Sequence, residues 1–491
     1  MNTIESTINT LKSAKNTIES QCDKSIVHTL VNDHHSCLNP THVARIYLPE
    51  SVGELSRIVK DAAQTNRQIA IAGGRHAMGG QQFLTDGILV DMTSMNKVIA
   101  FDKANGLVEV ESGLMWPTLI DYLKQSQNDS KAKWTISQKQ TGCDLLSIGG
   151  ALAANVHGRG LNKAPIVSDV EEFTIVMHDG TTRKCSRKSN TELFSLAIGG
   201  YGVFGIISSV RLRLVPQVTL RRSVEVCTSE KAVEKLEQQK LSGATFGDFQ
   251  FAIDSTSPDF LQSGILSTYT PVADTESANS QQKLLAENQW EELLYLAHVD
   301  KSKAFQIYRD HYLSTNGQLY LSDTFQLATY INGYHKKIDA RLGADCHGSE
   351  AITELYVPRS SLGVFMKRAA SLLLNERANV IYGTVRLIEP DQETFLAWAS
   401  QPWACIIFNL HVDHDHASIQ AVSNVFRNLF QLAIEFGGKY YLTYNKFAAS
   451  NQLQACYPQI PEFIDLKRKY DPSHRFNSDW FNYLQNSRNY F

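Results

Sequence analysis

Hydrophobic positions recur along the chain with two different spacings, which predict both helices and strands. Between residues 51 and 66 apolar side chains recur every three or four positions, and Ser51 with Glu54 forms a capping-box pattern. This segment is therefore predicted to be a helix. Residues 210–214 alternate between apolar and arginine side chains and are followed by Pro216, which predicts a half-buried strand.

The same patterns divide the chain into regions. Up to Pro216 the strand patterns are short and lie at 69–72, 88–92, 107–111, 172–177 and 181–185. Beyond it, helical patterns cover 287–313, 361–374 and 417–436, and strand patterns cover 351–357, 380–387 and 405–412. Residues 3–20 also have helical spacing. We therefore expect an α+β protein with a helical segment at 1–42, domains at 43–216 and 217–436, and a final segment at 437–491.

Three glycine-rich segments carry the first candidate chemistry. Residues 67–83 are RQIAIAGGRHAMGGQQF, residues 147–160 are SIGGALAANVHGRG, and residues 198–205 are IGGYGVFG. Glycine lets a backbone adopt positive φ and approach a ligand closely, so turns of this kind often hold phosphate groups with their amide N–H groups. For any one segment alone, a simple tight turn is the alternative.

Composition and charge exclude several classes of function. The net charge of −3 gives no basic footprint for nucleic acid, and no apolar run is long enough to span a bilayer. The N-terminus has no apolar signal-peptide core, so a cytoplasmic protein is expected. The eight cysteines are scattered without C-x-x-C spacing, and His34, His35 and Cys37 precede a turn, so no metal site is expected.

The order of the glycine segments, together with residues 467–480 (KRKYDPSHRFNSDW), resembles the flavoprotein superfamily of vanillyl-alcohol oxidase and p-cresol methylhydroxylase. The resemblance covers about 43–216 and 437–480. In pattern it is most similar to decaprenylphosphoryl-ribose oxidase and the alditol and sugar-lactone oxidases. It implies FAD as cofactor and a two-part FAD-binding domain of the p-cresol methylhydroxylase type, formed by 43–216 and 437–491, with an α+β substrate domain at 217–436.

The resemblance also implies which residues bind the flavin. His76 stands where many members join a histidine covalently to the flavin; a packed histidine without a bond is the alternative. Cys143 has a spacing similar to that of members with a second bond through sulfur; a buried free thiol is the alternative. The expected FAD-binding residues are Gly73, Gly74, Arg75, His76, Ala77, Gly79, Gly80, Cys143, Gly149, Gly150, Asn155, His157, Gly158, Gly200, Gly205 and Ile206.

Four residues are expected near the reaction centre on the same grounds. His157 resembles a residue beside the flavin ring, as a general base or a flavin contact. Arg386 resembles a cation that stabilises the reduced flavin. His411 and Tyr444 stand where the ribose oxidase has a cysteine and a lysine. They are expected as a base and a hydroxyl-binding group, or else as a core histidine and a packed aromatic.

The resemblance implies an FAD-dependent oxidoreductase that oxidises a CH–OH group of a sugar, polyol, lactone or related alcohol. Hydride would pass to flavin N5, and oxygen or a quinone would be the electron acceptor. The alternative is a flavin-binding partner or regulatory protein without turnover. In related lactone enzymes the residue before the His-Gly step gates oxygen. Here it is Val156, whose stiff side chain implies slow reoxidation unless it only packs a strand.

Overall fold

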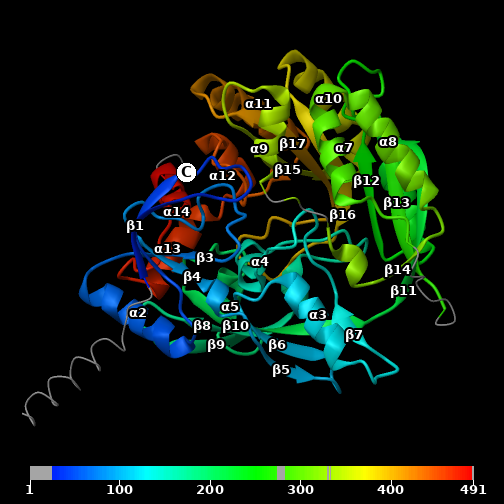
Figure 1. The fold of residues 1–491 in the computed structure, drawn as a ribbon. Helices are drawn as coiled ribbons and strands as arrows, with labels where there is room; N and C mark the ends of the chain where they lie inside the picture. Colours follow the sequence, from blue (N-terminus) through cyan, green and yellow to red (C-terminus); the bar gives the residue numbers. More distant parts are fainter. Residues whose placement is uncertain (1–24, 274–281, 329–330, 332, 489–491) are drawn as a thin grey trace, which may run out of the picture.

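The computed structural model describes residues 25–273, 282–328, 331 and 333–488, which build three β-sheets (Figure 1). The helix predicted at 3–20 lies outside these residues. The first sheet has the order β1-β2-β4-β3, formed by β1 (Ser25–Val31), β2 (Thr41–Tyr47), β3 (Ile69–Ala72) and β4 (Ile88–Asp91). β1 pairs antiparallel with β2, so the later part of the expected helical segment 1–42 is instead a strand that extends an open sheet edge.

Helix α2 (Val52–Gln64) covers this sheet and confirms the predicted helix. The Ser51 side chain accepts a hydrogen bond from the Glu54 N–H at 3.3 Å, as the capping pattern requires. The buried face of α2 packs against residues of β3 and β4, including Ile69 and Val90. The apolar spacing in the sequence thus fixes both the helix and the face that it buries.

The second sheet has the order β5-β6-β10-β8-β9, and β7 pairs with β10 beside this path. Its strands are β5 (Val98–Asp102), β6 (Leu107–Glu111), β7 (Trp134–Ile136), β8 (Val170–Val176), β9 (Thr182–Ser186) and β10 (Ile206–Pro216). Its helices are α3 (Trp116–Ser126), α4 (Ile148–Ala154) and α5 (Thr191–Ala197). The predicted hairpin at 172–185 is confirmed as β8 and β9.

The third sheet is antiparallel, with the order β14-β11-β13-β12-β16-β17-β15-β18. Its strands are β11 (Thr219–Thr228), β12 (Phe246–Phe251), β13 (Ser263–Pro271), β14 (Leu319–Leu321), β15 (Gly348–Pro358), β16 (Val380–Ile388), β17 (Trp403–Asp413) and β18 (Lys439–Tyr440). The accompanying helices are α6 (Ser229–Leu241), α7 (Glu287–Val299), α8 (Lys301–Ser314), α9 (Tyr334–Leu342), α10 (Leu362–Asn375) and α11 (His416–Glu435). Figure 1 shows α7, α8, α10 and α11 beside this sheet.

The single helix predicted at 287–313 is in fact two helices. Asp300 has an extended φ of −151°, and its side chain accepts from the Lys303 N–H at 3.0 Å, which ends α7 and begins α8. The prediction of one helix rested on apolar spacing alone. Asp300, a residue type favoured at helix N-caps, marks the start of a second helix inside that pattern.

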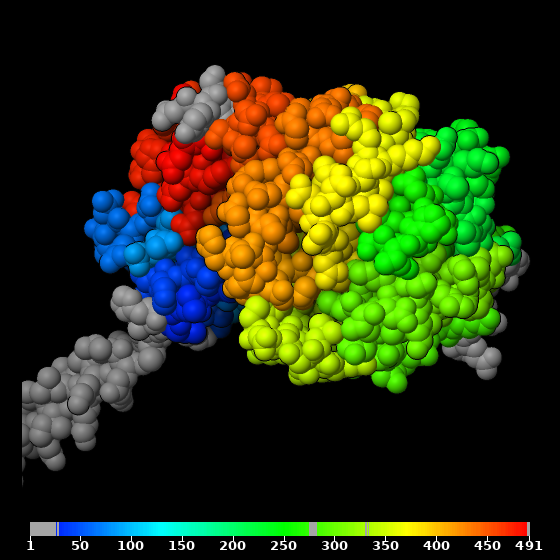
Figure 2. Space-filling view, turned by 90° about the horizontal axis from the view of Figure 1, so that it is seen from above, coloured from blue at the N-terminus to red at the C-terminus, as the bar shows by residue number. Residues whose placement is uncertain are grey.

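The C-terminal helices α12 (Ser450–Cys456), α13 (Ile460–Tyr470) and α14 (Asp479–Ser487) bring the chain back to the first sheet. The Ile69 N–H donates to the Arg475 carbonyl at 2.7 Å, and the Asn477 N–H donates to the Ile69 carbonyl at 2.9 Å. Figure 2 shows the red C-terminal residues against the blue residues near the start of the described chain. The ends of the described chain thus form one unit.

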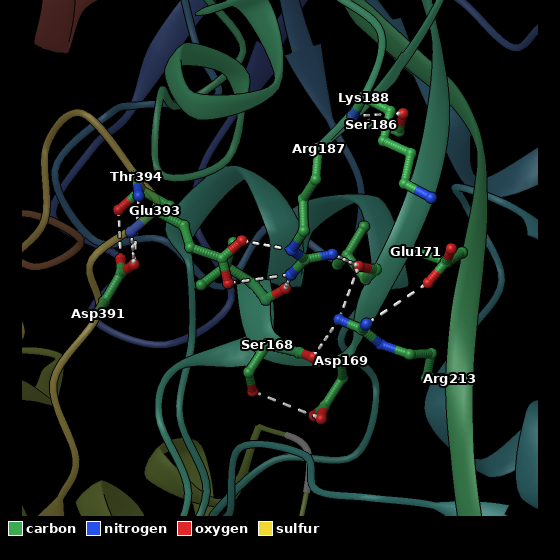
Figure 3. A network of polar contacts seen from close by, with 12 residues as sticks. Ser168, Asp169, Glu171, Ser186, Arg187, Lys188, Arg213, Asp391, Glu393 and Thr394 are labelled. Carbon is green, nitrogen blue, oxygen red and sulfur yellow. Dashed lines mark hydrogen bonds and ion pairs between the residues drawn. The ribbon is translucent and has the colours of Figure 1, made fainter. Parts of the chain in front are cut away.

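A polar network fastens the segment after β16 to the second sheet (Figure 3). Arg187, which follows β9, donates to both carboxylate oxygens of Glu393, with Nη2 at 2.9 Å from Oε1. The same guanidinium donates to the Val167 carbonyl at 2.8 Å. A bidentate arginine–carboxylate pair has a defined direction, so it holds the segment between β16 and β17 against the end of β9. Among the described residues, no helix is both long and apolar enough to span a bilayer.

Candidate functional site

A cavity of about 930 Å³ lies between the glycine-rich segments and the third sheet. One wall is formed by residues 71–78, by 146–157 around α4, and by 201–207 at the start of β10. Another part of the lining comes from β12, β15, β16 and β17 and from residues 441–444. Residues of α7 and α8 complete the lining. All three glycine-rich segments therefore meet at one cavity.

The loop after β3 turns its backbone toward this cavity. Arg75 has a φ of 57°, and the N–H groups of Gly74, Arg75 and Ala77 donate no hydrogen bond to other described residues. A Cβ at Gly74 would lie 2.2 Å from the Leu145 carbonyl oxygen, so this position requires glycine. Arg75 is held by Asp91, with Nη2 at 2.6 Å from Oδ2. The loop thus offers free amide donors beside a fixed guanidinium.

The second glycine pair of this segment lies behind the wall. Gly79 and Gly80 are buried and do not line the cavity. The Gly79 N–H already donates to Gln81 Oε1 at 2.8 Å, and a Cβ at Gly79 would lie 2.5 Å from the Tyr444 carbonyl oxygen. These two glycines allow the loop to pack closely on residues 442–446 and do not face a ligand.

His76 and Cys143 lie side by side in the cavity wall. Cys143 Sγ is 3.3 Å from His76 Nε2. Burial, with the neighbouring His35 and His34, lowers the pKa of His76 to about 3. Burial raises the pKa of Cys143 to about 11. At neutral pH a neutral imidazole therefore faces a protonated thiol.

The glycines that open α4 do not provide the free amides expected of them. The Gly149 N–H donates to the Ser112 carbonyl at 2.7 Å, and the Gly150 N–H donates to Ser147 Oγ at 3.2 Å. Both glycines line the cavity, and a Cβ at Gly149 would lie 2.7 Å from Ser112 Cβ. A Cβ at Gly73 would lie 1.9 Å from Ser147 Oγ. Here glycine serves close packing that lets the backbone form the wall.

Four further residues expected to bind the flavin are buried and do not line the cavity: Asn155, Gly158, Gly200 and Ile206. Asn155 ends α4 in the left-handed conformation, and its Nδ2 donates to Asp391 Oδ2 at 2.8 Å. It thus links the second sheet to the segment after β16. Gly205, in contrast, lines the cavity with a φ of 152°.

His157 lies against Glu354, a residue that the sequence did not single out. His157 Nε2 is 2.7 Å from Glu354 Oε1, and its Nδ1 is 2.9 Å from the Gly158 carbonyl oxygen. Because a carbonyl only accepts, Nδ1 carries a proton, and the Nε2–carboxylate contact requires a second proton shared by the pair. Tyr356 and Tyr444 donate their hydroxyls to the same carboxylate, Tyr444 at 3.3 Å. His157, Glu354 and Tyr444 all line the cavity.

Several donors keep Glu354 ionised although it is buried. Burial alone would raise its pKa, but the imidazole of His157, the hydroxyl of Tyr356 and the guanidinium of Arg386 lower it below 4.5 overall. The one sequence signal was a charged residue within the apolar strand pattern at 351–357. A buried carboxylate with this many partners is a common feature of functional sites.

Arg386 and Tyr444 line the cavity wall. Arg386, on β16, donates through Nη2 to Thr141 Oγ1, while its Nε is buried without a hydrogen-bond partner among the described residues. Burial and the nearby Glu354 raise the pKa of Tyr444 well above its ordinary value, so its phenol remains a donor. Together with Glu354, these two residues bring a cation, a hydroxyl donor and a carboxylate to the cavity.

His411 does not reach this wall. It lies on β17 outside the cavity lining, with its ring 4.9 Å from that of His298, and its backbone pairs with Glu350 of β15. A period of two places Asn409, which lines the cavity, and His411 on one strand face, so the sequence could not separate them.

Residues 43–186 match the family model described as an FAD binding domain. L-gulonolactone oxidase of Mus musculus is 29% identical over 191 residues, which are 39% of this chain and 42% of that protein. A putative D-arabinono-1,4-lactone oxidase of Neurospora crassa is 29% identical over 207 residues (42% and 36%). Cytokinin dehydrogenase 2 of Arabidopsis thaliana is 31% identical over 196 residues (39% and 37%).

The match to these relatives spans about two fifths of their length. It agrees with the arrangement found here, in which three glycine-rich segments line one cavity and the C-terminal segment returns to the first sheet. Residues 43–186 therefore match an FAD-binding domain, and over about two fifths of its length the chain is similar to lactone oxidases and to a cytokinin dehydrogenase.

Proposed function

We propose that the protein oxidises a CH–OH group of a sugar, polyol, lactone or related alcohol with FAD as the hydride acceptor. The observation that carries the proposal is the buried Glu354 carboxylate, bound to His157 and Tyr444 at the cavity. The same cavity is lined by Gly74, Arg75 and Ala77, whose N–H groups donate to no other described residue. A base and an anion-binding loop therefore line one cavity.

The residues present fit an FAD molecule. Glycines 73, 74, 149, 150, 202 and 205 line the cavity, and at several of them a Cβ would collide with neighbouring atoms. The free N–H groups of Gly74, Arg75 and Ala77, beside the Arg75 guanidinium, suit a pyrophosphate. Bound FAD would supply the hydride acceptor, the N5 atom of its ring system.

Glu354 is proposed to take the proton of the substrate hydroxyl. Its carboxylate stays ionised because three groups donate hydrogen bonds to it: the His157 imidazole and the hydroxyls of Tyr356 and Tyr444. Tyr444 lines the cavity and keeps its proton, so its hydroxyl can orient the substrate oxygen toward Glu354. Removal of the proton raises the tendency of the adjacent C–H to leave as hydride.

Arg386 is proposed to stabilise negative charge that develops on the cofactor. Its guanidinium lies in the cavity wall, and its buried Nε has no described partner. A cation that is already fixed in a buried site costs no reorganisation during the reaction.

His76 is proposed to carry a covalent bond to the flavin, with Cys143 as a possible second attachment point. The low pKa of His76 leaves a neutral, nucleophilic ring in the wall, whereas the raised pKa of Cys143 keeps its thiol protonated. The histidine bond is therefore the primary one. Acid precipitation should leave yellow colour in the pellet, and His76→Ala should release it, while Cys143→Ala alone should not.

The test of the activity is anaerobic flavin bleaching with a panel of sugars, polyols, lactones and other alcohols, with cytokinins as a separate arm. Bleaching by an alcohol supports the proposal. Bleaching by cytokinins alone would move the reaction to another substrate class. A yellow protein inert to the whole panel would favour a flavin-binding partner without turnover. We further propose a quinone-type acceptor in preference to oxygen, because Val156 lies in the cavity wall.

A further inference from the structure

Four titratable side chains from four different elements meet outside the cavity. They are His298 at the end of α7, His335 on α9, Glu350 on β15 and His411 on β17. His298 Nε2 lies 3.7 Å from Glu350 Oε1, and His335 Nε2 lies 3.9 Å from Glu350 Oε2. One ligand atom each from His298, Glu350 and His411 lie within 4.8 Å of one another. The side chains are 3%, 8%, 1% and 13% exposed in the order first named.

Three polar atoms of this cluster lack a hydrogen-bond partner in the part of the chain that the structure describes. They are His298 Nε2, Glu350 Oε1 and His411 Nδ1. Buried polar atoms in folded proteins nearly always have a partner, so three unpartnered atoms in one small cluster require an explanation. All three are groups that bind metal ions.

His298 and His411 are also oriented as metal ligands. His298 Nδ1 lies 2.8 Å from the Leu294 carbonyl oxygen and must donate to it, so Nε2 carries the lone pair. His411 Nε2 lies 3.4 Å from Asp413 Oδ1, which leaves Nδ1 to face the cluster. Metal-binding histidines usually donate their other ring nitrogen to a carbonyl or carboxylate in this way. Burial lowers the pKa of His298 to about 4, so its ring is neutral.

We propose that His298, Glu350 and His411, with His335 as the fourth ligand, bind one divalent metal ion of the zinc class. Imidazole and carboxylate donors suit zinc, and four protein ligands make a closed, structural site. Bonds of about 2.0–2.2 Å place neighbouring ligand atoms about 3.3–3.5 Å apart around a tetrahedral ion. The 3.7 Å between His298 Nε2 and Glu350 Oε1 is close to that spacing, while His335 Nε2 faces the other carboxylate oxygen at 3.9 Å and would have to move inward to become the fourth ligand.

The ion would connect α7, which lines the cavity, to strands β15 and β17 of the third sheet. Leu294 and Ala297 of α7 line the cavity next to His298, and Ile352 and Asn409 line it from the two strands that carry Glu350 and His411. A metal bridge between these elements would fix the position of α7 over the third-sheet wall. It would not touch the substrate, so its function is positional.

The experiment uses the full-length, flavin-loaded protein after dialysis against a chelator. Metal content is measured after incubation with Zn²⁺, and titration with Co²⁺ follows the visible bands of a tetrahedral ion. We expect one ion per chain and a raised midpoint of thermal unfolding. Glu350→Gln, which keeps the shape of the side chain, and His298→Ala should each weaken binding about 100-fold or more. Asp413→Asn should weaken it about 10- to 100-fold, as is usual for a residue that only orients a ligand.

The matched control is His347→Ala. His347 lies near the cluster on the exposed side and pairs with Asp339 at 2.7 Å, so its loss should leave Zn²⁺ affinity unchanged. Failure of the unmutated protein to retain stoichiometric Zn²⁺ or Co²⁺ would overturn the proposal. So would unchanged affinity in folded Glu350→Gln and His298→Ala proteins, or loss of binding in His347→Ala alone, which would place the metal on surface histidines.

Discussion

The two walls of the cavity are built by different means. Residues 71–78, 146–157 and 201–207 bring six glycines to the cavity beside larger side chains such as Arg75, His76 and Tyr201, and a Cβ at several of these glycines would collide with neighbouring atoms. Glu354 and Arg386 of the third sheet, and Tyr444 in the segment after β18, bring long polar side chains to the same cavity. The first wall can recognise a cofactor by shape and amide donors, whereas the second can move a proton.

Strand β15 carries two buried carboxylates, Glu354 and Glu350, whose surroundings differ. Glu354 accepts hydrogen bonds from His157 and two tyrosines, and its pKa is lowered. Glu350 is equally buried, and burial raises its pKa to about 8, although a hydrogen bond from the Asn409 side chain partly opposes this shift. The difference teaches that a buried acid becomes a base or a ligand according to what the neighbouring strands bring to it.

The largest effect is expected for Glu354→Gln, which removes the charge of the side-chain wall and keeps its shape. The rate of flavin reduction should fall about 10²- to 10⁴-fold, the usual contribution of a positioned base. Because the backbone wall is untouched, FAD content should not change. Anaerobic stopped-flow with saturating substrate measures the rate. An undiminished rate would mean that the base lies elsewhere.

The opposite result is expected for Gly74→Ala in the backbone wall. The new Cβ would lie 2.2 Å from the Leu145 carbonyl oxygen, so the loop must shift and its free amides with it. We expect FAD affinity or incorporation to fall about 10- to 100-fold, from roughly 1–3 kcal/mol of strain. Gly53→Ala on α2 is the control, since its nearest atom lies 3.9 Å away. Equal FAD content in both variants would contradict this account of the loop.

A smaller effect should appear in the pH dependence of stability. The folded-state pKa of Glu354 lies below the ordinary 4.5, so its contribution is fully present above pH 4.5 and is lost as pH falls through the folded pKa. Glu354→Gln should therefore destabilise the protein by ~1.5–3 kcal/mol at neutral pH, and by progressively less in acid. Unfolding measured between about pH 3 and pH 7 checks this. A difference that grows in acid would show that Glu354 is not held ionised.

The backbone wall could largely be predicted from the sequence, because glycines at fixed places in a strand–turn pattern leave a local signal. The loop at 73–77, the helices at 52–64 and 416–435 and most strands follow from that local information. The role of Gly149 could not, since its amide partner, the Ser112 carbonyl, comes from a distant segment, whereas Gly150 donates to Ser147, the local N-cap of α4.

The side-chain wall could be predicted only in part. Arg386, Tyr444 and His157 were expected through the resemblance, but Glu354 was not, because its partners come from distant segments that meet only in the folded sheet. His411 differs for the same reason. Its neighbours across the sheet and on α7, Glu350 and His298, place it in another cluster, and spacing along one strand does not reveal the neighbours.

The smallest effect is expected for substitution of Val156, which lies among the glycine-rich segments that line the cavity. Its N–H donates to the Ala151 carbonyl at 3.1 Å and its carbonyl accepts from the Ile166 N–H at 2.8 Å, so the backbone is fixed and only the side chain would change. Val156 lines the cavity and is stiff at χ1, so its methyl groups can obstruct oxygen at the reduced cofactor. Val156→Ala and Val156→Gly should raise the rate of reoxidation by oxygen about tenfold, a barrier change of ~1.4 kcal/mol, and leave flavin reduction by substrate unchanged. Stopped-flow mixing of reduced enzyme with oxygenated buffer measures this rate. Fast reoxidation of the unmutated protein, unaltered by either substitution, would show that Val156 only packs the wall and that oxygen is a normal acceptor.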